Sequence, residues 1–187
     1  AESDDFTVTG SLTLTKPTAI DVWKVETDTD MLGTQLHVAW TYTGSVGTLS
    51  LDFDPTGDFT GGDLRTDIFT GVAANNDPAG CTPPAGGGCY VLSGGQVPQA
   101  GELTNGATTA KFRLTGATPN PDVVSDGPST PAFEVRGWYD LTAPINTDTW
   151  LVGETTRQIQ WETHGNGMGN VAVQYNVNGA GWVTIAN

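Results

Sequence analysis

Apolar and polar residues alternate with a period of two along much of this chain. In an extended strand successive side chains point to opposite faces, so this pattern predicts strands with one buried face. No segment combines helical periodicity with capping residues. We therefore predict an all-β chain. The alternating runs are residues 6–9, 12–15, 36–40, 49–53, 133–135 and 171–175.

Turn-forming residues mark where several of these strands end. Pro17 and Pro144 have no backbone N–H to donate to a ladder, so each is predicted to interrupt an edge strand. Asn178-Gly179 is a pair favoured in two-residue hairpin turns, where both positions need a positive φ. The chain is thus predicted to consist of short strands joined by tight turns.

The chain repeats part of itself. Residues 6–25 match residues 133–152 without a gap, whereas chance would give about one identity in twenty positions. Residues 36–40 and 47–53 also parallel residues 157–161 and 169–175. The identical pairs in the first block are Phe6 and Phe133, Val8 and Val135, Gly10 and Gly137, Leu14 and Leu141, Thr15 and Thr142, Pro17 and Pro144, Asp21 and Asp148, Trp23 and Trp150, and Val25 and Val152.

This self-similarity predicts the domain organisation. Residues 12–137 form one complete module, and residues 138–187 begin a second module that contains only its first strands. Residues 1–11 match residues 128–138, which end a module, so they are predicted to be the last strand of a module. The chain is therefore out of phase with its own repeat.

The order of these motifs resembles a known family. Phe-x-Val-x-Gly, Leu-Thr-x-Pro, Trp-x-Val and the two later strands are similar to the Ig-like β-sandwich repeats of very large secreted bacterial and archaeal surface proteins. Those repeats are similar in turn to the N-terminal Ig-like domain of yeast Ser/Thr-rich cell-wall proteins. Residues 17–23 and 144–150 keep the spacing of the family's first turn without its glycines. The resemblance implies tandem Ig-like sandwiches with an extracellular structural or adhesive role and no catalytic residues.

Aromatic residues divide into two groups in this reading. Tryptophans that recur at matching positions of the two copies are predicted to lie in the core, because a small sandwich needs large buried side chains. They are Trp23, Trp40, Trp150 and Trp161. Trp138 and Tyr139 replace Ser11-Leu12 at the junction between modules, where they either pack on both sides or are exposed for a sugar or protein contact. Trp182 is open to either interpretation.

Charge and cysteine content narrow the compartment and the partners. The 187 residues carry 7 Lys and Arg against 21 Asp and Glu, a net charge of −14, which disfavours nucleic acid and anionic membranes as partners. No apolar run is long enough to insert across a bilayer. Cys81 and Cys89 flank a Pro-Pro and triple-Gly segment and are predicted to form a disulfide, which indicates an oxidising compartment. The alternatives are two free thiols or half of a metal site.

One acidic loop has the spacing of a calcium site. Oxygen-bearing side chains fall at loop positions 1, 3, 5, 7 and 12, with a glycine at position 6. They predict calcium binding, and the alternative is a solvated acidic loop. A second acidic turn contains Glu26, Asp28 and Asp30. The predicted ligands in the first loop are Asp52, Asp54, Thr56, Asp58 and Asp63.

Catalysis is not indicated, because neither His37 nor His164 lies in a recognisable nucleophile or metal motif. We expect an extracellular, cell-surface structural protein whose modules join end to end in a filament or layer. An incomplete module leaves an open edge that residues 4–12 of another copy could fill, with Phe6, Val8 and Leu12 as contacts. If the chain is instead a segment of a longer tandem array, the strand would come from the next module of the same covalent chain. The alternative function is a carbohydrate- or receptor-binding adhesin module.

Overall fold

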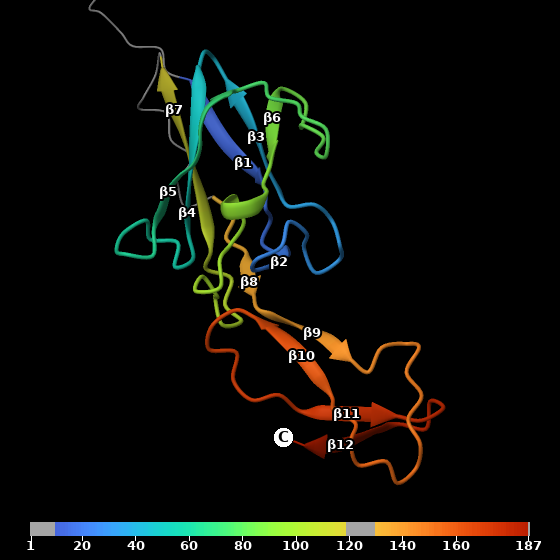
Figure 1. The fold of residues 1–187 in the computed structure, drawn as a ribbon. Helices are drawn as coiled ribbons and strands as arrows, with labels where there is room; N and C mark the ends of the chain where they lie inside the picture. Colours follow the sequence, from blue (N-terminus) through green and yellow to red (C-terminus); the bar gives the residue numbers. More distant parts are fainter. Residues whose placement is uncertain (1–9, 119–129, 187) are drawn as a thin grey trace, which may run out of the picture.

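The computed structural model describes residues 10–118 and 130–186, and within them the regular structure is almost entirely β (Figure 1). These residues contain no α-helix, and one short 3-10 turn, η1 (Gly94–Gln96), joins two strands. The prediction of an all-β chain is confirmed. The strands are β1 (Ser11–Lys16), β2 (Val22–Lys24), β3 (His37–Thr43), β4 (Thr48–Asp54), β5 (Arg65–Ala73), β6 (Gly87–Val91), β7 (Lys111–Thr118), β8 (Glu134–Arg136), β9 (Trp138–Ala143), β10 (Gln160–His164), β11 (Val173–Asn176) and β12 (Trp182–Ala186).

Residues 10–118 and 130–137, here called the sandwich part, enclose one hydrophobic core. One antiparallel sheet has the order β1-β3-β6 and the other has the order β5-β4-β7. The inward-facing residues of both sheets belong to one buried cluster, and Trp40 of β3 lies 6.2 Å from Phe69 of β5 between ring centroids. The arrangement is sandwich-like, which is consistent with the fold class that the resemblance implies.

A short parallel pair closes one end of this core. β2 and β8 pair in parallel, with Trp23 opposite Val135. The Trp23 ring lies 4.7 Å from the Phe133 ring and 5.5 Å from the Phe112 ring between centroids. Phe133 and Val135 are fully buried, so β8 acts as the last strand that covers Trp23.

Residues 138–186, here called the C-terminal part, reproduce the first half of the sandwich part. β9 pairs with β10 and β11 pairs with β12, both antiparallel. Leu141 lies opposite Trp161, as Leu14 lies opposite Trp40, and both pairs are followed by the same one-residue register shift. The repeat seen in the sequence is therefore also a repeat of strand register.

The turn after β1 also recurs after β9. Asp21 donates its N–H to the Thr18 carbonyl oxygen at 3.0 Å and accepts the Thr18 N–H with its carboxylate. Asp148 does the same with Ile145, at 3.0 Å and 2.9 Å. Between β11 and β12 both Asn178 and Gly179 have positive φ, which confirms the predicted hairpin turn.

The predicted boundaries remain predictions at the amino terminus. Ser11 and Leu12 belong to β1, and Leu12 is buried in the core of its own sandwich. Phe6 and Val8, which were predicted to contact a partner, lie outside the described residues.

Candidate interaction surface

Trp138 joins the two parts of the chain. Its indole N–H donates a hydrogen bond to the Val25 carbonyl oxygen at 3.0 Å. The ring stacks on the His164 ring with centroids 3.9 Å apart, and the Lys24 ammonium lies 5.0 Å from the Trp138 centroid. Of the two interpretations of Trp138, packing at the junction is the correct one. Tyr139 is more exposed and places its hydroxyl 3.4 Å from the Met168 carbonyl oxygen.

Further contacts cross the same junction. The Asn166 N–H donates to the Ala100 carbonyl oxygen at 2.7 Å, and His164 Nδ1 lies 3.5 Å from a carboxylate oxygen of Glu26. An open pocket of about 270 Å³ lies beside it, lined by residues of both parts, among them Leu103 and Met168. The junction therefore rests on hydrogen bonds and ring stacking beside an open pocket.

The glycine before each first strand occupies the same setting in both parts. A Cβ atom on Gly10 would lie 2.7 Å from the Thr43 carbonyl oxygen and 2.7 Å from a methyl carbon of Val46. On Gly137 it would lie 2.6 Å from the His164 carbonyl oxygen and closer still to the Met168 sulfur. His164 and Met168 are the repeat counterparts of Thr43 and Val46. The chain thus enters both parts in the same way, and only glycine fits there.

The two parts differ sharply in how well they cover equivalent side chains. Val25 is fully buried and Val152 is fully exposed, at 0% and 107% of the reference area. Trp23 and Trp40 are 4% and 0% exposed, whereas their counterparts Trp150 and Trp161 are 41% and 40% exposed. The predicted core position is thus confirmed for Trp23 and Trp40 and is wrong for Trp150 and Trp161 in this chain.

The cause is the set of strands that each part contains. In the sandwich part, β7 and β8 supply the rings and aliphatic groups that pack on Trp23. In the C-terminal part, β9 to β12 correspond to β1, β3, β4 and the start of β5, and counterparts of β6 to β8 do not occur in residues 138–186. The apolar positions so exposed, here called the open face, are Leu141, Trp150, Val152, Trp161 and Tyr175.

In the acidic loop predicted to bind calcium, the first two carboxylates, Asp52 and Asp54, contact other groups of the protein. Asp52 forms an ion pair with Arg113 at 2.7 Å, which points it across to β7. Asp54 is fully buried and accepts the N–H groups of Thr56 at 2.7 Å and Gly57 at 3.0 Å. The Thr56 hydroxyl also donates to Asp54 at 2.8 Å. Asp52 is therefore paired across the sheet, and Asp54 closes the turn.

The remaining predicted ligands lie further along the loop. The N–H and hydroxyl of Thr60 donate to Asp58 and hold the pKa of its carboxyl below the usual value, and Asp63 follows before β5. In the second acidic turn, Asp30 accepts the N–H groups of Leu32 and Thr34 at 2.8 Å. Among the described residues no three His, Cys, Asp or Glu side chains gather in a metal-binding group. Calcium binding stays a prediction.

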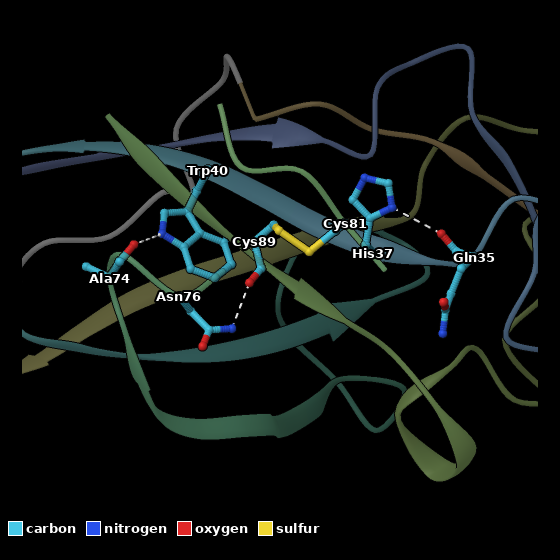
Figure 2. The surroundings of a disulfide bond; sticks show 7 residues. All are labelled: Gln35, His37, Trp40, Ala74, Asn76, Cys81 and Cys89. Atoms are coloured by element: carbon cyan, nitrogen blue, oxygen red, sulfur yellow. Dashed lines mark hydrogen bonds between the residues drawn. A yellow bond between two sulfur atoms is a disulfide. The ribbon is translucent and has the colours of Figure 1, made fainter. Parts of the chain in front are cut away.

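The predicted disulfide is present (Figure 2). Cys81 and Cys89 are bonded, and the Asn76 amide donates to the Cys89 carbonyl oxygen at 2.8 Å. Beside it the Trp40 indole N–H donates to the Ala74 carbonyl oxygen at 2.8 Å. The disulfide thus ties the loop before β6 to β6 itself, close to the buried Trp40. Its role is therefore structural.

Sequence reasoning missed several residues of the junction and of the open face. His164 is the platform for Trp138, and Val25 is the acceptor for its indole N–H. The signal for the junction was the repeated Phe-x-Val-x-Gly motif, whose glycine marks the close approach. Position-by-position matching assigned Trp150 to a core, because it compared residues and not the strands that pack on them.

Comparisons with known proteins leave the resemblance untested. No protein-family model matches the chain, and searches of the curated proteins and of the solved structures give no significant match. Across the described residues, no helix has the length and apolarity that crossing a membrane requires.

Proposed function

We propose that this chain is a structural protein of the cell surface whose Ig-like β-sandwich modules join end to end in a filament or layer. The single observation that carries this proposal is the open face. The same sequence positions are buried in the sandwich part and exposed in the C-terminal part, because strands that cover them in the first are missing from the second. Leu141 and Trp161 lie opposite each other on paired strands, and large apolar side chains left exposed in this way are typical of a site of contact with other protein.

We expect this contact to join modules end to end. The C-terminal part is itself half of a sandwich. Strands equivalent to β6, β7 and β8 would therefore pack on its open face. Such strands come from a neighbouring module, either of another copy or of a longer chain. Because the donating and accepting surfaces differ, the contact is head-to-tail and does not close on itself.

Other features support an extracellular setting. The Cys81–Cys89 disulfide is consistent with an oxidising compartment, and the net charge of −14 keeps a surface-exposed polymer soluble.

The experiment is sedimentation velocity over a wide concentration range, followed by negative-stain electron microscopy. We expect concentration-dependent association, strengthened in about 0.5 M salt because the acidic copies then repel each other less. Val152→Asp should abolish association, since it places a charge in the open face. Ile20→Asp is the matched control, because Ile20 is equally apolar and exposed but lies outside the open face. A strictly monomeric wild-type chain would contradict the proposal.

Carbohydrate binding is the second candidate. Trp182 is 70% exposed and lies on β12, outside the matched repeat positions, so its exposure is not explained by missing cover. Trp138 no longer supports this alternative as a free platform, because its ring is stacked on His164. A saturable change in tryptophan fluorescence with soluble glycans, lost in Trp182→Ala, would favour this candidate.

A further inference from the structure

The repeat also identifies which strand fits beside Trp150. In the sandwich part this place beside Trp23 is taken by β8, which pairs in parallel with β2 so that Val22, Trp23 and Lys24 lie opposite Glu134, Val135 and Arg136. The counterpart of β2 is residues 149–151, where no strand forms and Trp150 and Leu151 are exposed. Among residues 10–118 and 130–186, no strand takes the place beside residues 149–151 that β8 takes beside β2.

The chain contains a second β8-like segment. Residues 6–10 share Phe, Val and Gly with residues 133–137 at the same spacing. Residues 133–137 are already used in their own sandwich, where Phe133 and Val135 are fully buried. Residues 6–10 are the remaining match to β8 in this chain.

Gly10 and Gly137 occupy equivalent places at the start of β1 and β9. Gly137 joins β8 to the C-terminal part, and Gly10 makes the same close approach at the start of β1. In Figure 1 the start of β1 and the C-terminal part lie at opposite ends of the sandwich part. In the sequence, residues 6–9 directly precede strands that are built like those of the C-terminal part, and the first of these, β1, begins at the end of the sandwich part that is far from the open face.

We propose that residues 6–9 of a second copy add a parallel strand alongside residues 149–151, with Thr7 opposite Thr149, Val8 opposite Trp150 and Thr9 opposite Leu151. This inference rests on the proposed end-to-end assembly and names its donor and register. This register is obtained by replacing each residue of the β2–β8 pairs with its counterpart in the repeat. Phe6 and Val8 then cover Trp150 as Phe133 and Val135 cover Trp23.

The proposal predicts a register-specific crosslink between two copies. Paired residues of neighbouring strands have Cα atoms about 4.8 Å apart, within the range that a disulfide spans. Thr7 and Thr149 take the places of Glu134 and Val22, beside the core pair, so cysteines there leave Val8 and Trp150 intact. A mixture of Thr7→Cys and Thr149→Cys chains, oxidised in a glutathione buffer, should give a disulfide-linked heterodimer, mapped by peptide mass.

Thr9→Cys mixed with Thr149→Cys is the matched control. Two residues out of register, these positions would be about 8 Å apart and cannot be bridged without movement. We expect the in-register mixture to give a several-fold higher heterodimer yield. Val8→Asp should also lower the association of the wild-type chain several-fold, whereas Thr7→Asp should change it little, because β8 carries the acidic residue Glu134 at the equivalent position.

The outcomes separate this inference from the proposed function. If wild-type chains associate but both cysteine pairs crosslink equally, or Val8→Asp has no effect, the register is overturned and end-to-end assembly stands. If wild-type chains do not associate, the proposed function fails and this inference fails with it.

Discussion

Two valines at equivalent positions offer a direct test of the difference between the two parts. Val25 and Val152 occupy the same position of the repeat, but Val25 is fully buried in the core cluster and Val152 is fully exposed. The perturbation is the same in both cases, Val→Ala, which removes two methyl-sized groups and leaves the backbone unchanged.

The two substitutions should lower the free energy of unfolding by different amounts, because only Val25 is buried. At Val25 the lost transfer free energy is about 1.6 kcal/mol, and the cavity left in a packed core brings the total to roughly 2–3 kcal/mol. At Val152 no apolar area is lost from a core, so the change in the free energy of unfolding stays within about 0.5 kcal/mol.

The assay is urea unfolding followed by tryptophan fluorescence and far-ultraviolet circular dichroism, at concentrations where sedimentation shows a monomer. With a slope of about 1–3 kcal/mol per molar urea, Val25→Ala should lower the midpoint by roughly 1 M. A loss of about 2 kcal/mol for Val152→Ala would refute the reasoning, because Val152 would then be covered within a single chain. A negligible effect at Val25 would refute the assignment of the core.

Two other predictions concern the carboxylates. Burial alone would raise the pKa of Asp21, but the Thr18 N–H and the Lys16 ammonium outweigh it and hold the pKa below the usual carboxyl value. Asp21→Asn should therefore cost about 1 kcal/mol at neutral pH, and the difference from the wild type should vanish as the pH falls through the lowered pKa; a cost that persists at low pH would contradict this. If the loop that contains Asp58 binds calcium, millimolar calcium should raise the unfolding midpoint, and Asp58→Asn should abolish the increase. Equal midpoints with calcium and with chelator would contradict the calcium prediction.

Local chemistry accounts for what was predictable from the sequence. The period-two pattern requires one face of each strand to be buried, so it located β1, β3, β4 and β8. The Asn178-Gly179 turn was predictable because few residues adopt two successive positive φ values. The repeat located equivalent turns because the same residues make the same hydrogen bonds after β1 and after β9.

The candidate site was predictable only in outline. The amino-acid sequence determined that residues 138–187 repeat the first strands of the sandwich part and that Trp138 lies where the repeat begins again. It did not determine that the indole N–H reaches Val25 or that His164 forms a platform, since these contacts join residues far apart in the chain. Likewise, carboxylate spacing indicated a metal loop, but the nearby N–H groups and Arg113 take up Asp54 and Asp52.

Burial was decided only by the tertiary structure. Trp23 and Trp150 are the same residue at the same position of the repeat, and each follows a turn with the same hydrogen bonds. One is buried and the other is exposed because burial depends on the strands that pack on a side chain. The sequence by itself therefore determined which residues need cover, and the tertiary structure decided which of them receive it within one chain.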